Sequence, residues 1–172
     1  WKRYDKSGSW FYEIIATGFK YNMTDIQAAL GLVQLSRIEE MQRKRIALAA
    51  CYKEILSTMP DCFELPLDCE TGSKHALHLF MLRLNLNSLK IDRAEFIRQL
   101  AERQISASVH FIPVHLHPWY RDTYGYQGGE FPHCEEQYER EISLPFYSAM
   151  SSDQVIRVAE ACLEIADKFR SN

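Results

Sequence analysis

From residue 24 onward, apolar positions recur every three or four residues, the spacing of one face of a helix. Thr24 and Gln27 have the form of a capping box, in which each side chain bonds the backbone of the other residue. The first apolar positions after this cap are Ile26, Ala29, Leu30 and Val33. Pro60 ends the pattern. We therefore predict a helix over residues 24–59, long enough to contain a bend.

The hydrophobic pattern beyond Pro60 changes its period several times, which predicts alternating strands and helices. Residues 105–112 alternate most clearly: one face holds Ile105, Ala107, Val109 and Phe111, and the other holds Ser106, Ser108 and His110. Two strands are expected besides this one, over residues 76–86, buried on both faces, and over 142–146. Two helices are expected to begin at caps, a short one at the Asp92–Glu95 cap and the last one at a Ser151–Gln154 capping box. A short helix or turn over 117–125 and a helix over 135–142 complete the pattern.

This order predicts an α/β (α+β) fold, in which a few-stranded sheet is covered by helices and preceded by one long helix. We expect residues 1–23 to be a loop region, residues 24–59 to be an interdomain helix, and residues 60–172 to form a small α/β domain. The chain begins with a tryptophan inside a polar, aromatic segment, and we interpret it as part of a longer protein.

Composition narrows the classes of function. The 172 residues are 47% hydrophobic, enough for a sizeable core, and the net charge of −3 lacks the basic footprint of a nucleic-acid-binding domain. No apolar run is long enough to span a bilayer, and no signal-peptide pattern opens the chain. The five cysteines are widely spaced and contain no CxxC motif, which fits a reducing cytoplasm.

His110 is the residue best suited to chemistry. Small serines beside it on the predicted strand leave room in front of the ring, where a histidine can transfer a proton or donate to a substrate oxygen. The alternative is a structural histidine that is hydrogen-bonded at the sheet edge. Together with His115 and His117 it also suggests a metal-binding module. Pro113 and Pro118 break regular geometry there and no acid or cysteine nearby completes a ligand set, so we expect no metal.

A second candidate site lies just before the helix that begins at Thr24. Lys20 supplies a positive charge, Asn22 supplies amide donors, and a helix N-terminus adds a partial positive charge. This combination suits an anion such as a phosphate. The alternative is a solvated loop whose polar groups only cap the helix.

Three segments identify a family. "GFKYNMTDIQAALGLVQL" (18–35), "VHFIPVHLHPWYRDTYGY" (109–126) and "EISLPFYSAMSSDQV" (141–155) occur in the order found in the DegT-type (DegT/DnrJ/StrS) sugar aminotransferases. These are fold-type I enzymes that use pyridoxal 5′-phosphate. The resemblance extends upstream over residues 1–22 and so covers essentially the whole chain. Within the family, "GFKYN" and the histidines of 110–117 most resemble the UDP-4-amino-4-deoxy-L-arabinose type.

The resemblance implies an enzyme that moves an amino group from an amino-acid donor, with glutamate expected, to a keto sugar nucleotide. Family members are homodimers in which the loop before the capped helix reaches the partner's cofactor phosphate, and this implies a phosphate contact for Lys20 and Asn22. Many members carry asparagine and arginine at these two positions, so the sequence leaves open which residue touches phosphate. His110 matches a histidine that lines the active-site mouth near the substrate.

The resemblance also implies that the Schiff-base lysine and the large N-terminal domain lie upstream of this chain, because no lysine here matches the family's motif. We therefore expect residues 1–23 to be a cofactor and interface loop region that belongs to the large domain. The rest of the chain is expected to be the connecting helix and the C-terminal small domain, and the chain is expected to be inactive by itself. A non-catalytic regulatory relative and a histidine-cluster metal-binding module remain as alternatives.

Overall fold

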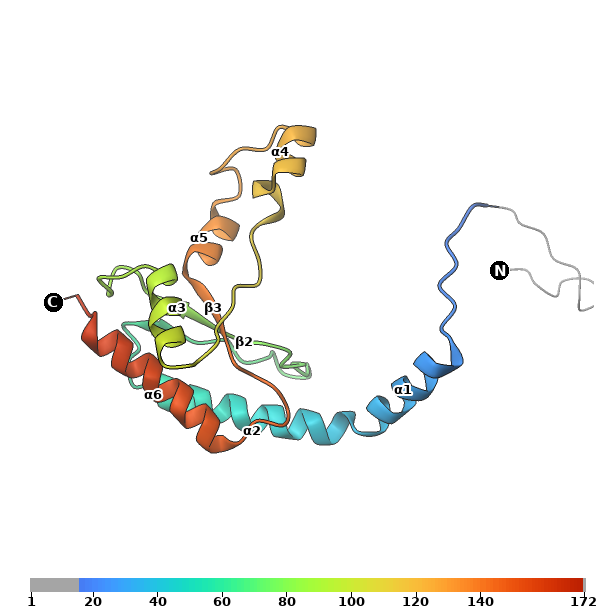
Figure 1. Ribbon diagram of the computed structural model, residues 1–172, viewed down its shortest axis with the longest axis horizontal. Helices are drawn as coiled ribbons and strands as arrows, with labels where there is room; N and C mark the ends of the chain where they lie inside the picture. The colour runs from blue at the N-terminus through green and yellow to red at the C-terminus, as the bar shows by residue number, and fades with distance from the viewer. Residues whose placement is uncertain (1–15, 172) are drawn as a thin grey trace, which may run out of the picture. The chain divides into compact units, whose positions relative to one another are not determined.

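The computed structural model describes residues 16–171, so the part of the predicted loop region before residue 16 lies outside the described residues. The chain divides into two compact units, one ending at Arg37 and one beginning at Ile38. The elements, in order, are α1 (Asp25–Ser36), α2 (Ile38–Leu56), β1 (Phe63–Glu64), β2 (Phe80–Leu84), α3 (Arg93–Glu102), a 3-10 turn η1 (Val114–Leu116), α4 (Pro118–Tyr124), α5 (Pro132–Arg140), β3 (Glu141–Leu144) and α6 (Ser152–Lys168) (Figure 1).

The helix predicted over residues 24–59 is divided at Arg37, where a turn separates α1 from α2, and α2 ends at Leu56. The predicted capping box is confirmed: the Gln27 N–H donates to Thr24 Oγ1, and the Thr24 N–H donates to Gln27 Oε1 at 2.9 Å. At the other end of α1, the Ser36 hydroxyl donates to the Val33 carbonyl at 2.9 Å. Such a local bond competes with the helix ladder, which accounts for the end of α1 at this position.

The sheet has three antiparallel strands in the order β1-β2-β3. β2 is shorter than the predicted strand over 76–86, and it is buried on one face only, which corrects the expectation of two buried faces. The reason is Arg83, whose guanidinium on the outer face pairs with Glu64 of β1 at 2.6 Å. β1 was not expected at all, because two residues carry no readable period.

The core of the second unit lies between the inner face of the sheet and the helices α2 and α6, which pack side by side (Figure 1). Tyr52 of α2 is fully buried and stacks on Phe80 of β2, with ring centroids 4.6 Å apart. The predicted capping box at the start of α6 is confirmed. Along α6, Val155, Ala159, Cys162 and Ala166 are buried on the face that packs into the core. The α/β (α+β) fold class is thus confirmed as a small sheet covered by helices.

The strand predicted over residues 105–112 is reduced to one bridge. Ser108 and Ser143 exchange two backbone hydrogen bonds, but Phe111 is 75% exposed and not on a buried face as predicted. Beyond this bridge, no further backbone hydrogen bond joins residues 105–112 to β3 within the described residues. The His110–Phe111 peptide bond is cis.

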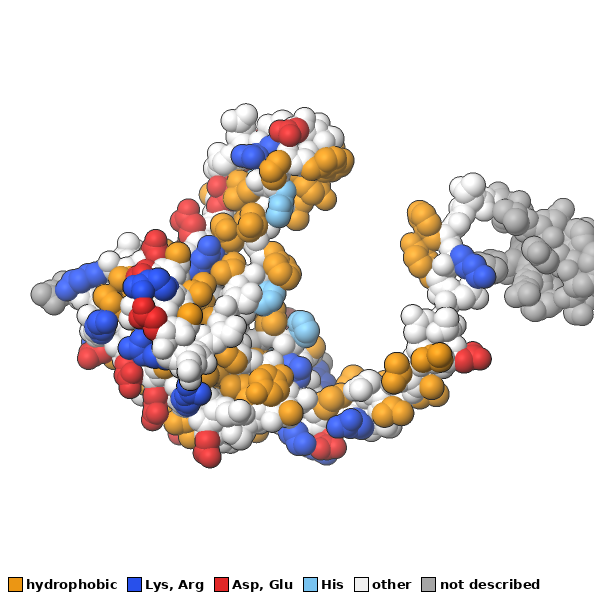
Figure 2. Space-filling model, viewed as in Figure 1, with side chains coloured by type: hydrophobic (Ala, Val, Ile, Leu, Met, Phe, Trp, Pro, Cys, Tyr) orange, Lys and Arg blue, Asp and Glu red, His pale blue; other side chains and the backbone are white. Residues whose placement is uncertain are grey.

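Residues 111–131, which we call the finger, leave the sheet and return through α5 (Figure 1). As predicted, α4 ends at Gly125, whose φ of 75° is left-handed. Aromatic rings follow one another along the finger, and hydrophobic side chains gather on its surface in Figure 2. The exposed members are Phe111, Ile112, Val114, Trp119, Tyr120, Tyr124 and Phe131.

The cysteines and the helices of the described residues can be compared with what the composition indicated. All five cysteines lie within residues 16–171, and each is a free thiol. Among the helices of this range, none combines the length and the apolar character needed to cross a membrane.

Candidate functional site

His110 lies where the segment after α3 leaves the edge of the sheet. Its ring is half-buried, and Nδ1 lies 2.8 Å from the hydroxyl oxygen of Ser143 on β3. Ser143 is only 4% exposed, and its backbone is fixed by the bridge to Ser108. The sequence predicted small serines beside this ring, but the serine that contacts it is 33 residues away along the chain.

Glu141, also on β3, is a neighbour of His110 that the sequence analysis missed. Burial raises the pKa of the Glu141 carboxyl above its usual value. The charges of His110, Arg93 and Arg83 oppose this rise, as does a hydrogen bond from the His110 backbone N–H. Glu141 Oε1 is buried without a hydrogen-bond partner. Alternation along β3 was the available signal, because it places Glu141 and Ser143 on the same face of the strand.

Charged residues on the outer face of the sheet form ion pairs close to Glu141. Glu64 accepts from Arg83 at 2.6 Å and from Arg140 of α5 at 2.7 Å. Arg93 at the start of α3 donates to the Tyr138 carbonyl of α5 and lies over the Tyr138 ring. These contacts hold α5 against the sheet, so the arginines have a structural role behind His110.

The three histidines considered as metal ligands have separate environments. His115 is buried, and its Nε2 lies 2.9 Å from Glu135 Oε1, whereas His117 is exposed at the start of α4. His110 contacts Ser143. Within residues 16–171 no group of three or more His, Cys, Asp or Glu side chains is placed to hold a metal ion.

Lys20 and Asn22 lie in the first unit, ahead of α1, and both are exposed. Within residues 16–171 no carboxylate forms an ion pair with Lys20. The first turn of any helix leaves backbone N–H groups without an intrahelical partner, and these face the same end. Asp25 in this turn opposes an anion, while Lys20 and the helix dipole favour one. A lysine, an amide and a helix start are therefore a donor set that fits a phosphate.

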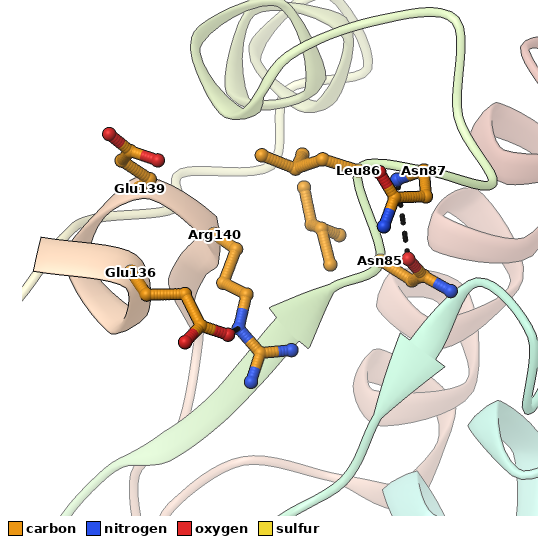
Figure 3. A pocket seen from close by; sticks show the side chains of 7 residues that line it. Asn85, Leu86, Asn87, Glu136, Glu139 and Arg140 are labelled. Atoms are coloured by element: carbon orange, nitrogen blue, oxygen red, sulfur yellow. Dashed lines mark hydrogen bonds and ion pairs between the residues drawn. The ribbon is translucent and has the colours of Figure 1, made fainter. Parts of the chain in front are cut away.

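Two cavities in the second unit lie elsewhere. The smaller, about 170 Å³, lies between the end of β2 and α5 (Figure 3). Two pairs of its polar groups contact each other: the Asn87 N–H donates to Asn85 Oδ1, and Arg140 forms an ion pair with Glu136 at 3.6 Å. The larger, about 600 Å³, is mostly apolar and lies between α2 and residues 66–81. Neither cavity is lined by His110, Ser143 or Glu141.

Comparison with known proteins places these residues in a family. The model of the DegT/DnrJ/EryC1/StrS aminotransferase family matches residues 2–163. An uncharacterized protein of Methanocaldococcus jannaschii is 48% identical over 170 residues, which cover 99% of this chain and 44% of that protein. The spore coat polysaccharide biosynthesis protein SpsC of Bacillus subtilis is 42% identical over 166 residues, covering 96% of this chain and 42% of SpsC.

Among solved structures, the PLP form of a Streptococcus pneumoniae protein assigned as a sugar aminotransferase superimposes with a TM-score of 0.80 at 29% identity. The match covers 94% of this chain and 40% of that one. The fold is that of the C-terminal portion of fold-type I aminotransferases, as the sequence predicted. This chain spans less than half the length of the curated relatives it matches.

Proposed function

The chain belongs to the DegT/DnrJ/EryC1/StrS aminotransferase family, and from this premise we propose that it is the C-terminal part of a cytoplasmic, pyridoxal 5′-phosphate-dependent enzyme. That enzyme transfers an amino group from an amino acid, with glutamate the expected donor, to a keto sugar nucleotide. The observation that carries the proposal is the match of the family model over residues 2–163. The similarity to a PLP-form sugar aminotransferase supports the choice of cofactor.

We assign the cofactor phosphate to Lys20 and Asn22. Their exposed side chains and the start of α1 form a set of donors suited to an oxyanion. In the proposed homodimer, this loop serves the partner's cofactor. A two-fold interface is self-complementary, so both sites would be built alike. The cofactor supplies the electron sink when bound, and these residues hold and orient it.

We assign His110 to the sugar substrate. It is half-buried at a sheet edge, with one ring nitrogen on Ser143 and the other without a recorded partner among residues 16–171. A histidine held in this way can donate a hydrogen bond to a sugar oxygen or transfer a proton.

The test uses the full-length protein, which the proposal expects to carry the Schiff-base lysine upstream. Lys20→Ala with Asn22→Ala is expected to weaken cofactor retention, measured as pyridoxal phosphate bound after dialysis. Heterodimers of this double variant with a Schiff-base-lysine variant would contain one site that lacks both defects. Verified heterodimers that regain activity support a loop acting across the dimer, and heterodimers that stay inactive indicate a loop acting within its own subunit.

His110→Ala and His110→Asn separate the two roles of the histidine. Loss of a proton-transfer group is expected to cost on the order of 10²-fold or more in kcat/KM. Loss of a single hydrogen bond to the sugar is expected to lower kcat/KM about tenfold. Asparagine keeps a hydrogen-bond donor but cannot transfer a proton at neutral pH, so His110→Asn should restore activity only if His110 acts by hydrogen bonding. Unchanged kinetics with a large fall in Tm would mean that His110 is structural.

A 172-residue chain incubated with pyridoxal phosphate is expected to show no borohydride-reducible lysine linkage.

A further inference from the structure

We infer that Ser143 is a positioning residue that fixes His110 as its Nε2–H tautomer, so that the ring presents a hydrogen-bond donor to the ligand. This inference rests on the proposed role of His110 and specifies the atom that would act. It comes from the geometry of β3 and of the segment that crosses it.

The Ser143 hydroxyl is in a fixed position. Its backbone N–H donates to the Ser108 carbonyl at 2.7 Å, and its own carbonyl accepts from the Ser108 N–H at 3.1 Å. The neighbouring residues Ile142 and Leu144 are buried in the core and prevent β3 from sliding. The oxygen that contacts His110 Nδ1 is therefore held by the fold itself.

The direction of the bond follows from what the buried hydroxyl can reach. Among residues 16–171, the Ser143 hydroxyl forms its hydrogen bond with His110 Nδ1. If Nδ1–H donated to the serine, the serine hydrogen would be left buried without an acceptor, which costs free energy. If the hydroxyl donates to Nδ1, both groups are satisfied. In the neutral ring the proton then belongs on Nε2.

The backbone that leads into His110 is held by the same strand. Ser108, two residues earlier, exchanges two backbone hydrogen bonds with Ser143, so the main chain and the ring of His110 are both held by β3. Two anchors on one strand leave the imidazole little freedom to rotate. The Nε2–H group is thereby oriented before a ligand arrives, which reduces the entropy cost of binding.

Nitrogen-15 spectra of the histidine rings in the 172-residue chain test the tautomer directly, with the His110 signals identified by their loss in His110→Gln. We expect one protonated nitrogen at Nε2 and one unprotonated nitrogen at Nδ1 in the neutral ring. Ser143→Ala should give averaged signals from two tautomers, and Ser143→Thr, which keeps the hydroxyl, should restore the single form. Ser106→Ala is the matched control, because Ser106 is exposed.

A neutral ring with its proton on Nδ1, or spectra unchanged in Ser143→Ala, would overturn the inference. Unchanged far-UV circular dichroism and Tm establish that Ser143→Ala is folded. If Ser143→Ala does not fold, the spectra of Ser143→Thr decide, because this variant keeps the hydroxyl and should keep the single Nε2–H tautomer. In the full-length protein, Ser143→Ala should lower kcat about tenfold, with Ser143→Thr recovering most of it. The spectra can be recorded whether or not the protein is an active enzyme, so this test does not depend on the proposed reaction. If the full-length protein is active but the spectra do not change in Ser143→Ala, only the positioning role of Ser143 is rejected.

Discussion

The buried ring of His115 contacts Glu135 across the base of the finger, with 2.9 Å between His115 Nε2 and Glu135 Oε1. The same carboxylate accepts the backbone N–H of Gly129 at 2.8 Å and that of Phe131 at 3.4 Å. Gly129 has a φ of 92°, so the loop turns there through a conformation that favours glycine. One carboxylate therefore joins both ends of the finger.

Glu135→Gln is expected to lower the Tm at neutral pH, because an amide is a weaker acceptor than a carboxylate. The Gly129 N–H, followed by the His115 side chain, holds the pKa of Glu135 below its usual value of 4.5. A lowered folded-state pKa gives stability that is present above the unfolded value and is lost as the pH falls through the folded one. The difference in Tm between wild type and variant should therefore shrink below about pH 4.5.

Glu139→Gln is the matched control for this change, because Glu139 lies on the same helix and is exposed. It should leave the Tm unchanged at every pH. Thermal melts of the three proteins from about pH 3 to pH 8 make the comparison. A Glu135→Gln deficit that stayed constant over this range would mean that the charge of Glu135 does not stabilise the finger.

Tyr52→Phe is expected to destabilise the second unit by about 1–3 kcal/mol, the usual cost of leaving a buried polar group unpaired. The Tyr52 hydroxyl donates to the Pro145 carbonyl at 2.8 Å, and the side chain is fully buried. Burial also raises the pKa of this phenol, which keeps it a neutral donor. Tyr147→Phe, at a half-exposed ring, is the control and should have no effect in denaturant unfolding. Equal stability of both variants would show that the Pro145 carbonyl is satisfied in another way.

The sequence predicts those features that depend on residues close together in the chain. The caps at Thr24 and Ser151 are bonds over three residues, so composition and spacing reveal them. The contact between His110 and Ser143 joins residues 33 apart and depends on how the chain crosses β3. The two-residue strand β1 exists only because β2 lies beside it. The end of the 105–112 strand was also unpredictable, since its pairing with β3 is limited to the bridge between Ser108 and Ser143, which are 35 residues apart.

Glu141→Gln should show the opposite pH dependence to Glu135→Gln. Burial raises the pKa of Glu141, so the folded state binds its proton more tightly than the unfolded state does. Wild-type stability then falls as the pH rises from the unfolded value of 4.5 through the folded one. Glutamine has a similar size and does not titrate, so it is neutral at every pH. The variant should match the wild type near pH 4 and have the higher Tm at pH 7, and a lower Tm at pH 7 would contradict this.

Gly31→Ala and Gly125→Ala place the same methyl group in open space, since neither added Cβ would have a neighbour within 4 Å. Gly31 lies inside α1, where alanine is the better helix former by about 1 kcal/mol. The amides of residues 28–36 should therefore exchange more slowly in Gly31→Ala, because they close the helical turns around this position. α1 has no buried residue among those described, so the Tm of the second unit should not change.

Gly125 ends α4 with a φ of 75°, a conformation that costs an alanine roughly 1–2 kcal/mol. Its N–H donates to the Arg121 carbonyl at 2.8 Å and closes the last turn of α4, so strain at residue 125 should loosen this turn. Gly125→Ala should therefore speed hydrogen exchange in α4, while the amides of α1 remain as in the wild type. Because both sites have open space for the methyl group, opposite effects can arise only from backbone conformation. Faster exchange in both variants would show that α1 needs glycine at position 31 for a reason other than helix propensity.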